Sequence, residues 1–175
     1  MRTVDLMFAN GNCEGAKKLA EPAALRGEPW AQFRMGALLV DEKCRPNAQD
    51  LGIAIEWLKK ATCHASNSDW ERGNELAVGS PGYFNARASS TKAAVMLADL
   101  AVSAHMEGMA WYYVEYARSQ YEPNEGSYQV LSRKLSAVEE SIGRDVFAKK
   151  SKNLDVCNNG HIPHWTQELV ARRLG

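Results

Sequence analysis

Apolar residues recur every three to four positions over most of the chain, which is the spacing of an amphipathic helix. The first such stretch covers about residues 13–26, and Gly27 follows it as a stop signal. The second begins at Pro29, where a helix starts readily, and lasts until the polar stretch 41–47. A third covers about 49–63. Segments of alternating Val, Ile and Thr are missing, so the pattern predicts an all-α fold.

The helical pattern weakens at about residues 64–90, where Ser, Asn, Gly and Pro are frequent. We interpret this segment as an irregular insertion between helices. Further helices are predicted at about 91–107, 109–120, 128–150 and 164–174. The length of 175 residues is typical of one domain. We therefore expect a single domain over 1–175 that contains this insertion and ends in a C-terminal helical region at about 127–175.

One spacing, Ala-x2-large apolar-x3-Ala, recurs along the predicted helices. It occurs as Ala16/Leu19/Ala23, as Ala54/Trp57/Ala61 and as Ala110/Tyr113/Ala117. A small residue on a helix face lets a neighbouring backbone approach closely, and a large apolar residue one turn away fills the space beside it. Each copy falls on a helix that would be the second member of a hairpin. The spacing therefore predicts core positions in repeated helical hairpins.

The stretch GEPWAQFRMGALL at 27–39, followed by IAIEWLKKA at 53–61, resembles the Sel1-like repeat family, a tetratricopeptide-type group. It is similar to that family's pattern of Ala-Gln, a Leu-Gly pair and Ala-x2-Trp-x3-Ala, with Met35 in place of the usual Leu. A weaker copy at 93–117 has Ala98 for the expected Gly and Tyr113 for the expected Trp. The resemblance implies a right-handed stack of antiparallel helical hairpins that binds another protein.

The chain has four cysteines, and no two of them have the CxxC spacing of a zinc or thioredoxin-like site. In a stack of antiparallel hairpins, Cys13 and Cys44 lie at the same end of a layer, which favours a bond between them and leaves Cys63 to pair with Cys157. The alternative is free thiols in a cytosolic protein. Bonded cysteines imply the periplasm or the cell exterior. We expect a periplasmic protein if an N-terminal signal was removed, and otherwise a cytoplasmic one.

Charge and hydropathy narrow the class of partner. Lys plus Arg and Asp plus Glu both number 21, so no net field attracts nucleic acid. The longest apolar stretches, 93–104 and 108–114, are interrupted or too short for the roughly 20 residues of a membrane span. We therefore expect a protein partner, without nucleic acid and without membrane insertion.

No set of residues indicates catalysis, a metal or a cofactor. His161 and His164 flank Pro163 and lack further ligands at suitable spacing. Adjacent residues such as Cys63 and His64 point about 100° apart on a helix. The pair Glu139-Glu140 is more typical of a solvated helix face than of an acid/base couple. The sequence also has no phosphate-binding loop and no GxSxG or HExxH motif, so we expect a protein that is not an enzyme.

Candidate partner contacts are the aromatic and charged residues that lie outside the repeated positions. The insertion contains Trp70, Glu71, Arg72, Tyr83 and Phe84. These residue types are frequent at interfaces, although the aromatic rings would equally serve to fix the insertion to the core. Trp111 and Tyr112 have the same two interpretations.

The family resemblance also suggests the biological role. Among small Sel1-like proteins with cysteines, we expect a bacterial immunity protein that neutralises a secreted toxin, including phospholipase effectors of the type VI system. The alternative is a scaffold or assembly adaptor in a cell-envelope or signalling complex. Both roles require a protein-binding surface.

Overall fold

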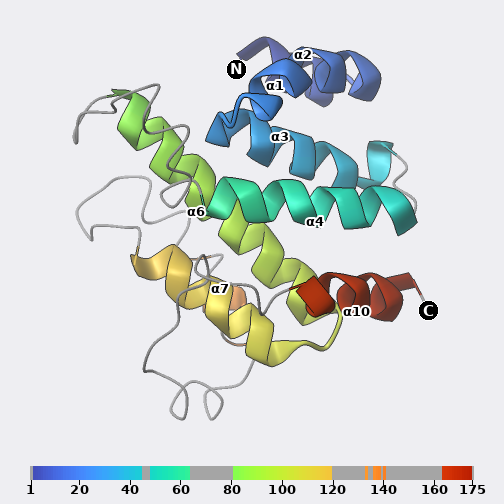
Figure 1. The fold of residues 1–175 in the computed structure, drawn as a ribbon, viewed down its shortest axis with the longest axis vertical. Coiled ribbons are helices and arrows are strands. Elements are labelled where there is room, and N and C mark those ends of the chain that lie inside the picture. Colours follow the sequence, from blue (N-terminus) through green and yellow to red (C-terminus); the bar gives the residue numbers. More distant parts are fainter. Residues whose placement is uncertain are drawn as a thin grey trace. The chain divides into compact units, whose positions relative to one another are not determined.

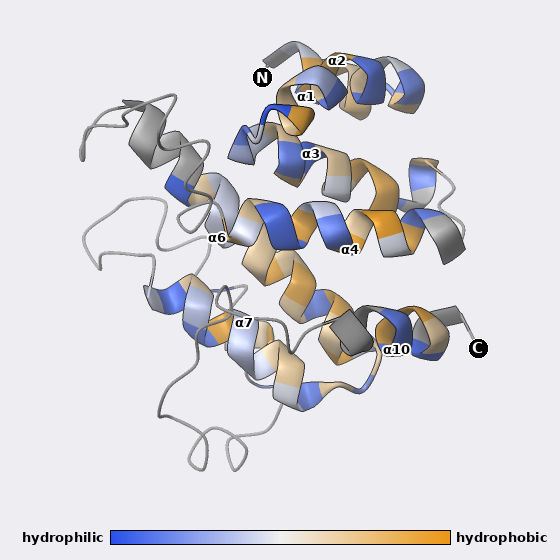
Figure 2. Ribbon diagram, viewed as in Figure 1, coloured by the Kyte–Doolittle hydropathy of each residue, from blue (hydrophilic) through white to orange (hydrophobic). Residues whose placement is uncertain are grey.

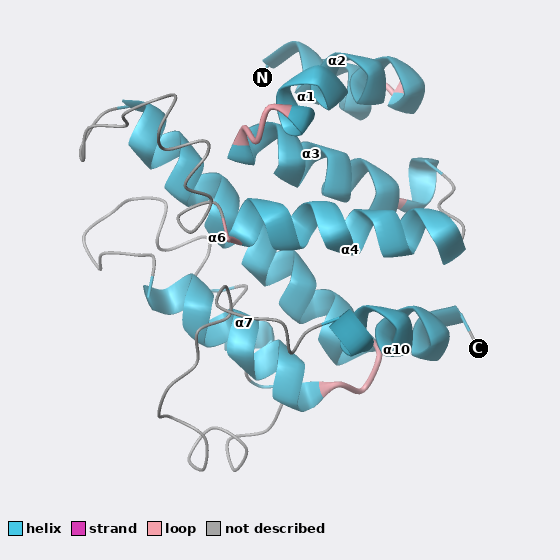
Figure 3. Ribbon diagram, viewed as in Figure 1, coloured by secondary structure: helices cyan, strands magenta, loops and turns pink. Residues whose placement is uncertain are grey.

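The computed structural model describes residues 2–44, 48–63, 81–119, 133, 136–138, 140 and 163–174. Every regular element within these ranges is a helix and none is a strand (Figure 3). This confirms the predicted all-α class for that part of the chain. By packing, the chain divides into two compact units, Met1–Ala93 and Ala94–Gly175. The apolar pattern gives no sign of this division.

The first unit is a succession of helices in which chain neighbours pack against each other. Its helices are α1 Arg2–Ala9, α2 Cys13–Leu25, α3 Pro29–Val40, the short 3-10 helix η1 Glu42–Cys44, and α4 Ala48–Thr62. α1 packs on α2, α2 on α3 and α3 on α4 (Figure 1). The bounds of α2, α3 and α4 follow the predicted helices closely.

Helix α1 was not predicted, because a charged residue, Asp5, interrupts its short apolar run. In the folded chain this carboxylate forms an ion pair with Arg34 of α3, with 2.7 Å between Oδ1 and Nε. Val4, on the same helix, is buried in the core. A tertiary contact thus accommodates the charge that weakens the helical pattern in the sequence.

Local signals fix the start of α2 and the turn into α3. The side chain of Asn12 accepts a hydrogen bond of 3.0 Å from the backbone N–H of Gly15, which caps α2. After α2, Gly27 has a φ of 89°, a conformation that glycine adopts without steric cost. Pro29 then begins α3, at a position where its missing N–H costs nothing. The chain therefore turns back within a few residues.

Helices α3 and α4 supply the larger apolar residues of the first unit. Figure 2 shows hydrophilic residues recurring along α4, as expected of an amphipathic helix, whereas α3 is mostly hydrophobic and nine of its twelve residues are buried. The contact between them is close at Gly36, where an added Cβ would lie 2.5 Å from Cγ of Leu58 and 3.1 Å from the carbonyl oxygen of Ala54. Leu58 is fully buried. Glycine at this position is therefore required by the approach of the two helices.

Helix α6, Pro81–Ser103, begins ten residues earlier than the sequence pattern predicts. The prediction of irregular structure was thus wrong for 81–90. Gly, Asn and Ser make this stretch a poor helix former by itself, but it starts with a proline and is tied to α4. Ser90 donates a hydrogen bond of 2.6 Å to the carbonyl oxygen of Thr62, and both residues are buried. This contact satisfies a carbonyl in the last turn of α4.

The second unit contains the end of α6 together with α7, Glu107–Ser119, and α10, Pro163–Leu174. These two helices confirm the predictions for 109–120 and 164–174. Its buried apolar side chains include Val95, Leu97, Leu100, Trp111, Tyr113, Val114 and Leu169. The predicted helix over 128–150 lies mostly outside the described residues.

The turn between α6 and α7 is joined to α10 by a hydrogen bond. His105 has a φ of 54°, which is unusual for a residue other than glycine. Its carbonyl oxygen accepts a hydrogen bond of 3.0 Å from the guanidinium of Arg172, which also pairs with Glu168. One side chain of α10 therefore fixes the position of this turn.

Candidate functional site

The three copies of the repeated spacing differ in how far their large apolar residue is buried. All six alanines are buried, from Ala16 to Ala117. Tyr113 is buried as predicted, and Trp57 is partly buried against the core of the first unit. Leu19, however, is 47% exposed. The spacing therefore identifies close helix contacts correctly, but its large residue is a core residue only where another helix covers it.

Large exposed apolar residues are concentrated in the first unit. Within the part of the chain that the structure describes, they are Leu6 at 64%, Leu19 at 47%, Leu25 at 72% and Ile53 at 42% exposed. Isolated exposed apolar residues are common on protein surfaces and need no function. Leu25 differs from the others because aromatic and charged side chains follow it directly in the turn between α2 and α3.

In this turn a carboxylate joins an arginine to a tryptophan. Glu28 Oε1 accepts a hydrogen bond of 2.8 Å from the guanidinium of Arg26, and its Oε2 accepts one of 2.6 Å from the indole N–H of Trp30. The Arg26 side chain is 65% exposed, whereas that of Glu28 is 27% exposed. Trp30 is partly buried against the core of the first unit. The triplet is thus anchored at the tryptophan and open to solvent at the arginine.

We call Leu25, Arg26, Glu28 and Trp30 the α2–α3 turn surface. Tryptophan and arginine are the residues most often found at the energetic centre of protein interfaces, especially where part of the side chain is already held in place. The backbone here is fixed by Gly27 and Pro29, so the surface requires little ordering on binding. The apolar pattern does not indicate this surface, because Trp30 and Arg26 lie within predicted helices. Their closeness to a sharp turn is the signal that was available.

The predicted contacts of the insertion cannot be placed. Trp70, Glu71 and Arg72 lie outside the described residues, and so do the side chains of Tyr83 and Phe84, whose backbone is in α6. The role of these residues therefore stays a prediction.

The two candidates on α7 have different environments. Trp111 is only 2% exposed, so its ring belongs to the core of the second unit and is not available at the surface. The interpretation as a core residue thus holds for Trp111. Tyr112 is partly exposed and contacts Trp111 edge to face, with 5.5 Å between ring centroids. Only Tyr112 stays a candidate for partner contact.

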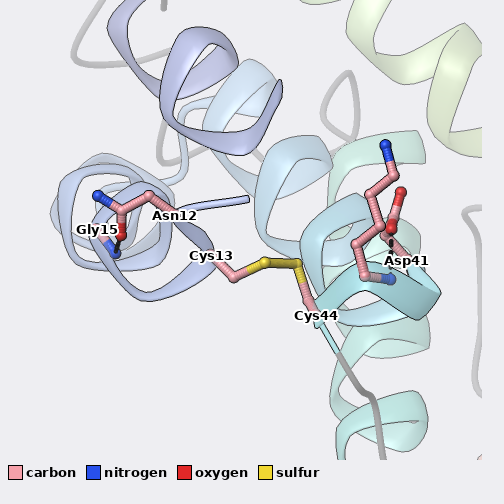
Figure 4. The surroundings of a disulfide bond; sticks show 6 residues. Asn12, Cys13, Gly15, Asp41 and Cys44 are labelled. Carbon is pink, nitrogen blue, oxygen red and sulfur yellow. Dashed lines mark hydrogen bonds between the residues drawn. A yellow bond between two sulfur atoms is a disulfide. The ribbon is translucent and has the colours of Figure 1, made fainter. Parts of the chain in front are cut away.

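The predicted disulfide between Cys13 and Cys44 is present. It joins the start of α2 to η1, with 5.7 Å between the two Cα atoms and 31 residues of sequence separation (Figure 4). On the Cys44 side, Asp41 accepts a hydrogen bond of 2.8 Å from the backbone N–H of Lys43. Cys63 is disulfide-bonded as well. Its predicted partner, Cys157, lies outside the described residues. The bonded pair is compatible with an oxidising compartment.

Metal-binding and membrane-spanning features are absent from the described residues. Among the described residues, no group of three or more His, Cys, Asp or Glu side chains is arranged to hold a metal ion. In the same part of the chain, no helix combines the length and apolarity needed to cross a membrane. Glu140 is exposed, while Glu139, His64 and His161 and the side chain of His164 are not described.

Comparison with protein families, with curated proteins and with solved structures finds no match to the chain. Any functional conclusion therefore rests on the residues themselves and on the resemblance stated for 27–61. Of the described surfaces, the α2–α3 turn surface combines the most features that favour contact with another protein.

Proposed function

We propose that this chain is a protein-binding module of the Sel1-like, tetratricopeptide-type class, and that the α2–α3 turn surface is part of its binding site. The observation that carries this proposal is the Arg26–Glu28–Trp30 triplet beside the exposed Leu25. A guanidinium and a partly buried indole are already held by one carboxylate, an exposed leucine precedes them directly in the chain, and such preorganisation reduces the entropy lost on binding.

The wider architecture that we propose is a right-handed stack of helical hairpins. Two observations support it: consecutive helices pack on each other, and the repeated alanines are all buried. Gly36 occupies the small-residue position of the Sel1-like Leu-Gly pair, and the close approach of Leu58 explains why a small residue is needed there. In such stacks each layer contacts mainly its neighbours.

For the biological role, we propose a bacterial immunity protein that binds and neutralises a secreted toxin, such as a type VI phospholipase effector. The resemblance to small Sel1-like proteins suggests this role, and the Cys13–Cys44 bond is in keeping with a periplasmic site of action. A scaffold or assembly adaptor would use the same surface. The two roles differ in stoichiometry, since an inhibitor forms one tight complex and a scaffold forms several weaker ones.

The proposal is tested by capture of partners from envelope extracts of the native organism, with the oxidised full chain as bait. The test variant is Leu25→Ala/Arg26→Ala, which removes the two most exposed side chains of the α2–α3 turn surface. The matched control is Leu6→Ala, because Leu6 is similarly exposed but lies on α1. Circular dichroism and thermal melting establish that all three proteins are folded.

We expect wild type and Leu6→Ala to retain one stoichiometric partner and Leu25→Ala/Arg26→Ala to bind it at least tenfold more weakly, since interface arginines and apolar anchors often contribute about 1–2 kcal/mol each. If the partner has phospholipase activity, addition of the chain should abolish that activity. Equal capture by both variants would exclude the α2–α3 turn surface. Several weak partners without any inhibited enzyme would favour the scaffold role.

A further inference from the structure

Helix α2 is attached to α3 at both of its ends. At the C-terminal end of α2 the chain passes through a short turn into Pro29, the first residue of α3. At the N-terminal end, Cys13 is bonded to Cys44, which follows the end of α3 at Val40 by four residues (Figure 4). Both ends of α2 are therefore held against the two ends of a single partner helix.

Apart from these attachments, the buried side chains that α1 and α2 themselves contribute to the first unit are mostly small. Their buried apolar residues are Val4, Ala16, Ala20, Ala23 and Ala24, with Met7 and Phe8 partly buried. The leucines of both helices, Leu6, Leu19 and Leu25, are exposed. An alanine removes only one methyl group from water, so each of these residues contributes little to docking.

Helices α3 and α4 contribute larger buried side chains than α1 and α2. Their buried residues outside the cluster shared with α1 and α2 include Phe33, Leu39, Leu51, Ile55 and Leu58, whereas Met35 and Leu38 of α3 belong to that shared cluster. Long aliphatic and aromatic side chains bury several times the apolar area of alanine. We therefore expect the α3–α4 pair to stay folded under conditions in which α1 and α2 detach.

We propose that the Cys13–Cys44 disulfide is a redox-sensitive clamp, which keeps α1 and α2 docked on α3 when oxidised and releases them when reduced. With the bond intact, a detached α2 is a closed loop of about 15 residues between Cys13 and α3, so detachment gains little chain entropy. With the bond broken, the segment is free at one end and detachment gains much more. This inference does not depend on the proposed function.

The chemistry requires a dithiol as the reductant. Its thiolate attacks one sulfur of the Cys13–Cys44 bond, that bond breaks, and the displaced cysteine sulfur takes up a proton. The second thiol of the reductant then attacks the mixed disulfide, which releases the other cysteine as a thiol and leaves the reductant as its own disulfide. Two electrons and two protons pass to the protein. Both cysteines are only partly buried.

Hydrogen exchange of backbone amides, resolved by peptide, measures the docking of each helix separately. The test compares the oxidised full chain with Cys13→Ala/Cys44→Ala and with Cys63→Ala/Cys157→Ala. The last variant is the matched control, because it removes the other two cysteines and leaves the clamp closed. A second measurement adds dithiothreitol to the folded wild-type chain, so that no cysteine is replaced.

We expect exchange in α1 and α2 to accelerate on the order of 100-fold in Cys13→Ala/Cys44→Ala and in the reduced wild type, from the entropy of a loop of this length. Exchange in α3 and α4 should change by no more than a few-fold. The control should retain wild-type protection in α1 and α2. Unchanged protection of α1 and α2 in both tests would overturn the proposal. So would equal loss of protection throughout the first unit, which is the result of a general cross-link or of a variant that fails to fold.

Discussion

Replacement of Gly36 by alanine tests the close contact between α3 and α4. An alanine Cβ at this position would lie 2.5 Å from Cγ and 2.7 Å from Cδ2 of Leu58, whereas ordinary contact begins at 3.4 Å. Leu58 is fully buried, so its side chain has no open space to move into. The two helices would have to separate by roughly 1 Å at this point.

Two opposing effects determine how much Gly36→Ala changes the free energy of unfolding. Overpacking of a dense core costs about 1–3 kcal/mol, and the gain in helix propensity from glycine to alanine returns about 1 kcal/mol. The net loss is therefore about 0–2 kcal/mol, and we expect Gly36→Ala to lower the free energy of unfolding by about 1 kcal/mol. Gly52 is the matched control: it lies inside α4 and an added Cβ would meet nothing within 4 Å. Gly52→Ala should raise the free energy of unfolding by about 0.5–1 kcal/mol.

Urea denaturation followed by far-UV circular dichroism measures both changes, with the m-value reported for each variant to detect a change in cooperativity. The same substitution in the Leu58→Ala background tests the contact between Gly36 and Leu58 directly. Leu58→Ala removes the two side-chain atoms closest to the new Cβ and leaves only the Ala54 carbonyl oxygen at 3.1 Å, so Gly36→Ala introduced into Leu58→Ala should destabilise the chain far less. The coupling between the two positions should therefore be about 1 kcal/mol. If Gly36→Ala is as stable as Gly52→Ala in the wild-type background, the close contact between α3 and α4 is refuted.

Three further predictions concern the ends of helices. Asn12→Ala should lower the free energy of unfolding by about 1 kcal/mol, because it removes the side-chain cap of α2; an unchanged urea midpoint would show that the cap contributes nothing. His105→Gly should raise the thermal midpoint, with a gain of about 0.5 kcal/mol from relief of the positive φ, and a lower midpoint would contradict this reasoning. Arg172→Ala should cost about 1 kcal/mol or less, because the hydrogen bond to the His105 carbonyl is lost and the pair with Glu168 is half exposed. Amide exchange should then accelerate in α10, and slower exchange would exclude the contact.

The helices of the first unit show what the pattern of apolar residues captures and what it does not. It predicts α2, α3 and α4 well, because their apolar residues recur at helical spacing and Gly27 and Pro29 mark the turn between them. It misses α1, whose only buried apolar residue is Val4. It also assigns 81–90 to an irregular insertion, because the contact that stabilises this stretch, from Ser90 to the end of α4, involves residues 28 positions apart. Such contacts leave no periodic trace in a sequence.

In the candidate site, too, features that follow from helical spacing were predicted, and features that depend on individual side-chain contacts were not. The Cys13–Cys44 bond was predicted because antiparallel helices bring the start of one beside the end of the next. The α2–α3 turn surface was not, since the roles of Arg26 and Trp30 depend on side-chain hydrogen bonds to Glu28 rather than on spacing. Apolar spacing also gave no means of telling Leu19, which is exposed, from Tyr113, which is covered.

The position of the Cys13–Cys44 bond has a consequence for the order of events during folding. Helix α3 has 12 residues and is therefore about 18 Å long. Cys13 and Cys44 lie close together when α2 packs antiparallel to α3. Helix pairs between chain neighbours form early and quickly, because little chain must be closed to make them. Oxidation of this pair therefore captures those molecules in which α2 is docked on α3 at that moment, and the bond then keeps the correct pairing.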